Sequence, residues 1–307
     1  MKEKTTPGFY VTASLKGISQ VILIENAMAG LLILAAVFIT SWQLGIIAFL
    51  SAMIGTCSAK FLGADQAAAE RGLFGYNAVL AGMGLFLFLK GPAQWGLALL
   101  GAFFTVLVSA ALMHLFKKWD LPVLTLPFIL LTWAMLLSAY RLGTVHLSPD
   151  LVPQSLSRVK LEAAGSTNWL EGLVNGFGQI FFIEHNISCL LILAAVFYAG
   201  WHIGLFAIFA NLLSIAAAYL LGGDTTLITL GLYGYNAILA VLAVSVDFHV
   251  GSRMKSIIAG TLAAVLSVFM TATVSAMLLP YGLPSLTMPF VLTSWLILSA
   301  RKILPAL

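Results

Sequence analysis

Charge is scarce along this chain, and its scarcity argues against a soluble protein. Only 8% of the 307 residues are charged, whereas 61% are hydrophobic. A soluble domain carries about 25% charged residues, so we expect this chain to fold in lipid. The net charge of +4 comes from basic residues dispersed over several short loops. Because they form no single basic patch, a nucleic-acid partner is not expected.

Residues that hold metals or cofactors are also few. The two cysteines, Cys57 and Cys189, lie in or beside apolar segments, and we interpret them as small buried hydrophobic side chains without a disulfide or metal role. The chain contains neither a Walker-type phosphate loop nor an Asn-Pro-Ala motif. No arrangement of a nucleophile with a base is visible. We therefore expect no cofactor, no metal and no enzymatic activity.

Long apolar stretches are present instead, and they occur twice. Residues 17–38 align with 176–197 at 12 of 22 positions, 73–81 with 232–240 at the same offset of 159, and 121–128 with 283–290 at an offset of 162. Three matches in one order indicate two copies of one unit, which is typical of membrane pores and carriers whose site lies between the copies. We predict copies at 1–140 and 169–307, joined by a polar linker at 141–168.

Each copy contains five apolar segments of about the length that a membrane span needs, roughly 20 residues. They lie near 24–42, 44–62, 73–89, 95–116 and 121–140, and near 183–200, 203–221, 229–247, 256–279 and 284–300. A shorter stretch precedes each set, at about 10–22 and 169–181, and we interpret it as a re-entrant half-helix. The predicted fold is an all-α integral membrane protein. Its two inverted repeats each have five transmembrane helices and one half-helix, and together they enclose a central pore.

The odd number of spans in each copy predicts that the second copy crosses the membrane in the opposite direction. The amino-terminal side then holds Lys2, Lys4, Lys16, Lys60, Arg71, Lys117, Lys118, Arg253, Lys255, Arg301 and Lys302, and the other side holds Lys90, Arg141, Arg158 and Lys160. Because cytoplasmic loops are enriched in Lys and Arg, we predict that both termini are cytoplasmic. The protein is then a multi-pass protein of the inner (plasma) membrane.

The pattern Leu-Pro-x-Leu-Thr-x-Pro-Phe occurs in both copies. A proline inside a helix removes an amide donor and frees the carbonyl four residues earlier; we expect Pro127 to free that of Val123 and Pro289 that of Ser285. Thr125 and Thr287 lie between the prolines and carry hydroxyls that donate and accept. Two such breaks facing each other predict a polar patch at mid-membrane. Alternatively, the prolines only kink packed helices and the threonines bond to their own backbone.

Amide and aromatic side chains also recur in the two copies. Gln20 and Gln179 end the predicted half-helices, and each offers a donor and an acceptor. Tyr76 and Tyr235 are followed four residues later, on the same helix face, by Leu80 and Leu239. Flat rings beside a line of polar groups favour a thin planar solute, although aromatic packing alone is the alternative interpretation.

Two carboxylates, Glu25 and Glu184, are strictly repeated. An acidic residue within a membrane span is by default a candidate functional residue. Each of these, however, lies where a half-helix ends and a full helix begins, where a carboxylate can satisfy free amides and meet the positive end of the helix dipole. We favour this structural role and keep proton coupling as the alternative.

These motifs together resemble the urea transporter family. The resemblance rests on the doubled Leu-Pro-x-x-Thr-x-Pro-Phe, the Gly-Tyr-Asn-Ala-x-Leu segments, and the Gly-x-x-Gln-x-x-x-Ile-Glu lead-in before Leu-Leu-Ile-Leu. It covers nearly the whole chain outside the amino terminus and the linker. The resemblance implies a homotrimer in membrane lipid, with a separate channel in each protomer through which urea moves passively down its gradient.

The resemblance also implies roles for individual residues. On the two half-helices, the residues expected to face the pore are Gln20, Val21 and Leu23 on one and Gln179, Ile180 and Phe182 on the other. The narrow middle is expected to lie beside Leu80 and Leu239 and to contain the hydroxyls of Thr125 and Thr287. A cytoplasmic aromatic slot is expected at Tyr76 and Tyr235. The family tends to have phenylalanine at the positions of Leu23, Tyr76 and Tyr235. Two alternatives stay open at this point: a proton-coupled urea or amide carrier, and a channel for another small neutral solute such as ammonia, water or a short amide.

Overall fold

The computed structural model describes residues 7–158, 167–249, 251–304 and 307. The chain divides into two compact units. Unit 1 is Met1–Lys118 with Pro127–Pro149, and unit 2 is Trp119–Leu126 with Asp150–Leu307. Lys2, Lys4 and Lys160, which entered the topology prediction, lie outside the described residues, as do all of residues 159–166 of the predicted linker.

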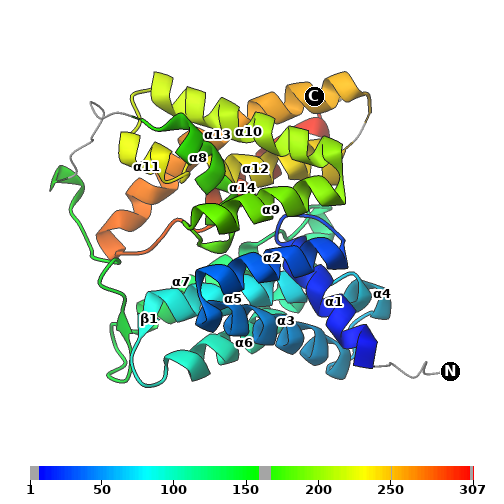
Figure 1. Cartoon of the computed structure of the whole chain (residues 1–307), viewed down its shortest axis with the longest axis vertical. Helices are drawn as coiled ribbons and strands as arrows, with labels where there is room; N and C mark the ends of the chain where they lie inside the picture. The colour runs from blue at the N-terminus through cyan, green and yellow to red at the C-terminus, as the bar shows by residue number, and fades with distance from the viewer. Residues whose placement is uncertain (1–6, 159–166, 250, 305–306) are drawn as a thin grey trace. The chain divides into compact units, whose positions relative to one another are not determined.

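Unit 1 is built mainly of helices (Figure 1). They are α1 (Pro7–Gln20), α2 (Ala27–Thr40), α3 (Trp42–Phe61), α4 (Gln66–Glu70), α5 (Gly75–Phe88), α6 (Gln94–Phe116) and α7 (Leu126–Ser138), whose first residue falls in unit 2. Two short strands, β1 (Leu89–Lys90) and β2 (His146–Leu147), pair antiparallel with Leu89 opposite Leu147. Helix α5 lies in the centre of the unit, packed against α3 and α6, and most of its residues are buried.

Unit 2 repeats this order of helices. They are α8 (Trp169–Gly178), α9 (Asn186–Ala199), α10 (Trp201–Leu220), α11 (Thr225–Thr229), α12 (Gly234–Leu242), α13 (Arg253–Leu278) and α14 (Met288–Arg301). A single 3₁₀ turn, η3 (Gln179–Phe181), extends α8, and a π-helical turn, η4 (Ala243–Asp247), extends α12. Helix α12 is buried throughout and packs against α10, α13 and α14.

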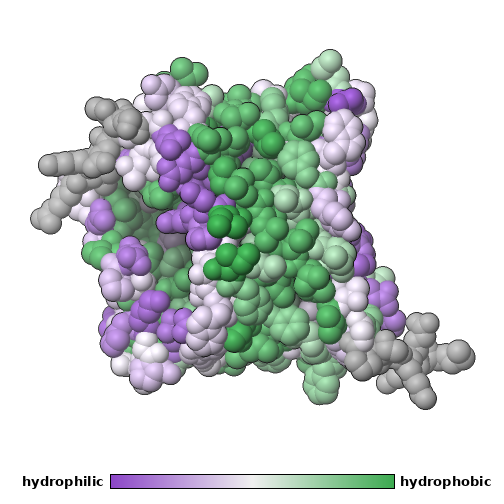
Figure 2. All heavy atoms as spheres, viewed as in Figure 1, coloured by the Kyte–Doolittle hydropathy of each residue, from purple (hydrophilic) through white to green (hydrophobic). Residues whose placement is uncertain are grey.

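The apolar helices mark the chain as a membrane protein. Among the described residues, four helices are long and apolar enough to cross a membrane: α3, α10, α6 with its extension to Trp119, and α13 with its extension to Tyr281. The pair Trp169–Phe181 and Asn186–Ala199 passes the same test jointly but is bent by 79°. Hydrophobic side chains dominate the surface over α2 and α3 and over α9 and α10 (Figure 2), as a lipid-facing surface requires.

Each predicted span contains a helix, but several helices are shorter than predicted. The stretches at 24–42 and 183–200 contain helices of 14 residues each, and those at 121–140 and 284–300 contain helices of 13 and 14 residues. Before α7 and α14 apolar residues continue into the turn, and before α2 and α9 an apolar residue is followed by a polar pair, Glu25 with Asn26 or Glu184 with His185. Hydropathy alone therefore does not locate the helix start. The number of spans stays a prediction, since among the described residues five apolar helices outside the bent pair have only 10–17 residues.

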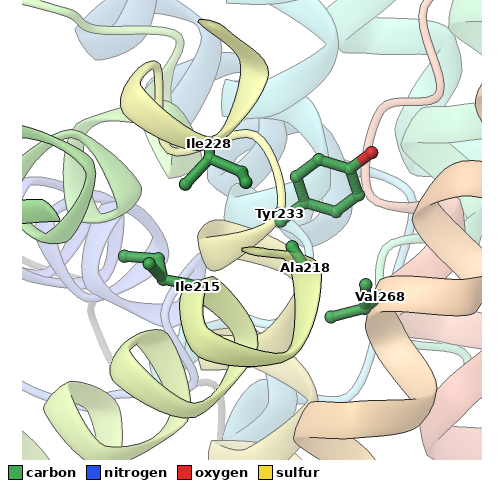
Figure 3. Close-up of a cluster of buried hydrophobic side chains, with 5 residues drawn as sticks. All are labelled: Ile215, Ala218, Ile228, Tyr233 and Val268. Carbon is green, nitrogen blue, oxygen red and sulfur yellow. The ribbon is translucent and has the colours of Figure 1, made fainter. Parts of the chain in front are cut away.

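The two units contain equivalent hydrophobic clusters. One cluster of unit 1 includes Ala59, Phe74 and Val106, and one of unit 2 includes the repeat-related Ala218, Tyr233 and Val268, with Ile215 and Ile228. In Figure 3 the Tyr233 ring lies against this cluster while its hydroxyl points away from the aliphatic side chains. The phenylalanine-to-tyrosine difference is therefore accommodated because only the ring is packed among carbon atoms.

Backbone turns recur at the same places as well. Gly72 and Gly231 have φ of 78° and 77°, and a Cβ atom on either would lie 2.4 Å from the backbone nitrogen of Gly17 or Gly176. Each glycine thus combines a left-handed conformation with direct backbone contact to the first helix of its unit. The shared turn places the later part of α1 or α8 against the start of α5 or α12.

Candidate permeation site

The first helix of each unit ends where the sequence predicted. Helix α1 ends at Gln20, and α8 passes into the single turn that begins at Gln179. The chain then reverses through two left-handed residues, Leu23 (φ 58°) and Phe182 (φ 59°). Because left-handed backbone is costly for residues with a side chain, surrounding contacts must hold both turns. Whether these helices are re-entrant in a membrane stays a prediction.

The two glutamines at these helix ends donate through their amide nitrogens to different partners. Gln20 Nε2 donates to the carbonyl oxygen of Arg71 at 3.3 Å, whereas Gln179 Nε2 donates to the Glu184 carboxylate at 3.1 Å. Gln20 is 9% exposed and Gln179 is partly exposed. Each amide is thus fixed through its nitrogen, while its oxygen is the group with which it accepts hydrogen bonds.

Glu25 does not cap a helix, contrary to the sequence prediction. Its carboxylate accepts from Lys16 Nζ at 2.9 Å and from Arg71 Nε at 3.0 Å. The side chain of Asn26 caps α2 instead, by accepting from the amide of Ala29 at 3.0 Å. An amide oxygen suffices for the cap, which leaves the carboxylate to the two cations.

The charges around Glu25 keep it ionised. Partial burial works against ionisation, but the hydrogen bonds and charges of Lys16 and Arg71 outweigh it and lower the pKa of Glu25. Glu184 lies in the equivalent turn and accepts from Gln179; residues 175 and 230, where the repeat would place the two cations, are Asn175 and Leu230.

The prolines of the doubled motif lie in the first turn of a helix and not inside one, so the expectation of freed carbonyls was wrong. Pro127 is the second residue of α7 and Pro289 the second of α14. The carbonyl oxygen of Val123 accepts from the amide of Leu126 at 3.3 Å, and that of Ser285 from Met288 at 3.2 Å. Proline is favoured here because its fixed φ suits a helix start and the amide it lacks has no intrahelical partner.

Two asparagines that the sequence analysis did not single out cap these helices. Asn77 Oδ1 accepts from the amide of Phe128 at 3.3 Å, and Asn236 Oδ1 accepts from that of Phe290 at 3.1 Å. Both asparagines are buried. They follow the tyrosines in the repeated Tyr-Asn-Ala motif, so their recurrence was the signal that could have identified them.

Thr125 and Thr287 are hydrogen-bonded to each other within unit 2. Their hydroxyl oxygens are 2.7 Å apart, and the two residues are 2% and 4% exposed. Leu124 and Leu286, which precede them, are both left-handed, with φ of 51° and 50°. The hydroxyl of Tyr235 donates to the carbonyl oxygen of Leu286 at 2.5 Å and so supports one of the two turns. The prediction that the two motif breaks face each other thus corresponds to a direct contact between hydroxyls.

The remaining predicted site residues divide between the units. Val21 and Leu23 follow α1, with Tyr76 and Leu80 on α5; Ile180 and Phe182 follow α8, with Tyr235 and Leu239 on α12. Val21, Leu80, Ile180 and Leu239 are at most 1% exposed, whereas Leu23, Tyr76 and Phe182 are partly exposed. In each unit the Tyr and Leu are four residues apart on one helix, as predicted.

Known proteins resemble this chain over most of its length. The sequence model of the urea transporter family matches residues 11–302. The chain belongs to the urea transporter family. It is 30% identical to urea transporter 1 of Ovis aries and of Capra hircus, and 29% identical to that of Rattus norvegicus; each alignment covers 97% of this chain and 79% of the relative. Family membership makes the protein a transporter and not an enzyme, and supports a urea transport function.

Proposed function

We propose that the protein is a passive, selective urea channel of the cytoplasmic membrane. The path would be lined by Gln20, Val21, Leu23, Tyr76, Leu80, Thr125, Gln179, Ile180, Phe182, Tyr235, Leu239 and Thr287. The observation that carries the proposal is the buried hydroxyl pair of Thr125 and Thr287 in a chain of the urea transporter family.

The chemistry of this pair suits urea. Urea is flat, uncharged and rich in N–H donors. When one threonine hydroxyl donates to the other, both oxygens keep a lone pair that can accept from urea. Each such hydrogen bond contributes only about 1 kcal/mol net. Several weak acceptors in series therefore hold the solute without trapping it, as a conducting path requires.

The two glutamines would extend this series of acceptors. Because Gln20 and Gln179 donate to the protein through nitrogen, their oxygens would accept from urea at either end. Leu80 and Leu239 would press on the faces of the solute, and a hydrated ion would lose its water shell in this apolar surrounding. The departures at Leu23, Tyr76 and Tyr235 from the family's usual phenylalanine would adjust the fit to urea.

The surroundings of Glu25 argue against its use in proton coupling. Two cations pair with its carboxylate and lower its pKa, which favours the ionised form. A coupling carboxylate instead needs to be protonated during the cycle. Glu25 therefore serves a structural role in this proposal.

The proposed membrane arrangement follows from the sequence. Ten spans in two inverted repeats of five, with one re-entrant half-helix each, would leave both termini in the cytoplasm. The copies would occupy 1–140 and 169–307, with the linker at 141–168 between them. By resemblance to the family, the protein would be a homotrimer in the inner membrane with one path in each protomer.

Uptake of radiolabelled urea into liposomes that contain the purified protein tests this function. We expect rapid uptake that thiourea inhibits and that needs no proton gradient. A panel of neutral solutes measured by stopped-flow light scattering would show urea ahead of water, ammonia and longer amides. Water permeation alone would reject the urea assignment. Uptake that requires a proton gradient and disappears in Glu184→Gln would reject the passive mechanism.

A further inference from the structure

One side of α14 holds the segment Trp119–Leu126 at several points within unit 2. In order along the segment, these are Lys302 Nζ with the carbonyl oxygens of Trp119 (2.7 Å) and Asp120 (3.0 Å), Trp295 Nε1 with that of Pro122 (2.8 Å), and Thr287 with Thr125 (2.7 Å between hydroxyls). The Lys302 ammonium also lies 3.4 Å from the Asp120 carboxylate. The segment is thus fixed at its start, its middle and its end.

The spacing of the three α14 partners explains how one helix reaches the whole segment. Thr287 and Lys302 cap α14 at its start and its end, and Trp295 lies within the helix. Their spacings of 8 and 7 residues place them within about 80° of one another around the helix axis. From the first to the last, the helix rises about 22 Å. The seven residues from Trp119 to Thr125, which are joined by six Cα–Cα steps, span at most about 20 Å. The contacts pair the segment with α14 in antiparallel order.

The segment needs such support because its backbone is strained at two places. Asp120 and Leu124 are both left-handed, each with φ of 51°. Residues with a side chain adopt this conformation only where the surrounding structure holds them. Trp295 binds between these two residues, and Lys302 binds at the first. Releasing either anchor would let the backbone relax and move Thr125.

We propose that Trp295 and Lys302 are positioning residues that hold Thr125 against Thr287 and thereby set the selectivity between urea and larger neutral amides. Trp295 acts through the carbonyl of Pro122, three residues before Thr125. Lys302 acts through the start of the segment. This inference rests on the proposed function, because selectivity has meaning only if the threonine pair lies on the urea path.

The position of Thr125 is measured without transport by disulfide formation. Thr125→Cys and Thr287→Cys are combined in a protein in which Cys57→Ser and Cys189→Ala remove the native thiols. The rate of disulfide formation with copper phenanthroline is then measured with and without Trp295→Phe. This change keeps a ring and removes the indole donor. We expect the rate to fall about fivefold, the factor that corresponds to one hydrogen bond of about 1 kcal/mol.

Selectivity is measured with the native threonines in place. We expect Trp295→Phe and Lys302→Met each to raise the permeability to methylurea relative to urea by about threefold to fivefold, the range expected for losing one hydrogen bond. Lys302→Arg retains a cationic donor and is expected to restore most of the selectivity. Trp201→Phe and Lys118→Met are the matched controls, because both side chains are exposed.

The outcomes separate this inference from the proposed function. An unchanged rate of disulfide formation in Trp295→Phe would overturn the positioning role. A slower rate with unchanged selectivity in both variants would overturn the link to permeation. If the unmodified protein conducts no urea, the proposed function fails whatever the disulfide rate, and the selectivity role fails with it.

Discussion

Units 1 and 2 share their backbone turns but differ in how they hold the glutamine at the end of α1 or directly after α8. In unit 1, Gln20 donates to the backbone of Arg71, whose side chain pairs with Glu25. In unit 2, Gln179 donates directly to Glu184. The repeat therefore preserves where the amide lies while its partner has changed from a carbonyl to a carboxylate. The backbone conformation of these turns is therefore the same in the two units, whereas the charged residues around the glutamine differ.

The largest loss of stability is expected from substitutions at the glycines of the shared turns, which test whether both turns require glycine. Gly72→Ala and Gly231→Ala each place a Cβ 2.4 Å from a backbone nitrogen at positive φ. We expect each to lower the free energy of unfolding by about 3 kcal/mol or more, from left-handed strain plus overpacking. The measurement is thermal or denaturant unfolding in detergent.

Gly63 and Gly222 provide the matched controls for these substitutions. Both have positive φ, of 82° and 72°, but a Cβ there would meet nothing within 4 Å. Gly63→Ala and Gly222→Ala should therefore cost only about 1 kcal/mol. A small effect of Gly72→Ala beside a large one of Gly231→Ala would show that the two turns are not equivalent.

The helix caps are expected to have the next largest effect. Asn77→Ala and Asn236→Ala each remove the side-chain acceptor at the start of α7 or α14. Losing a cap costs about 1–2 kcal/mol, and we expect a loss of this size in each variant. Unfolding in detergent measures both, and equal stability of the two variants and the unmodified protein would refute the capping role.

The smallest expected effect separates the two glutamates. Glu25→Gln removes two partly exposed ion pairs, so we expect a loss of up to about 1 kcal/mol that shrinks in high salt. Glu184→Gln keeps an acceptor for Gln179 and should change stability little. Unfolding at low and high salt compares the two variants. A salt-dependent loss in Glu184→Gln alone would reverse this assignment.

The contribution of Glu25 to the free energy of unfolding depends on pH. Because folding lowers the pKa of Glu25, its charge stabilises the protein above the ordinary glutamate pKa of about 4.3, and the contribution disappears as pH falls through the lowered value. The stability difference between the unmodified protein and Glu25→Gln should therefore be present at pH 7 and be lost in acid. A difference that grows in acid would contradict this account.

Local pattern predicted much of the helical structure. Apolar runs located the helices, and repeated residues located the helix end at Gln20 and the turn at Gln179. The helix starts at α7 and α14 were misplaced because Leu124 and Leu286 are left-handed leucines, for which no glycine or asparagine gives a local signal. Long-range hydrogen bonds were also invisible. Trp295 and Pro122 are 173 residues apart, and nothing in either neighbourhood indicates the other.

The boundary of the first copy also could not be predicted from the sequence pattern. Pattern matching assigns residues 121–128 to the first copy, yet Trp119–Leu126 belongs to unit 2. Its partners there are Thr287, Trp295 and Lys302. Sequence similarity therefore shows which copy the segment corresponds to, but it does not show which unit the segment packs in. Hydrogen bonds to residues far away in the sequence determine its packing.

The central claim is that the hydroxyls of Thr125 and Thr287 accept hydrogen bonds from urea as it passes through the protein. Urea flux through liposomes is measured for Thr125→Val, Thr287→Val and the double variant, since valine keeps the shape and removes the hydroxyl. We expect each single variant to reduce flux about fivefold, the factor for one hydrogen bond, with the folded protein retained. The double variant should lose less than the two single losses combined, because the hydroxyls act as a pair. Unchanged urea flux in the double variant would contradict the account.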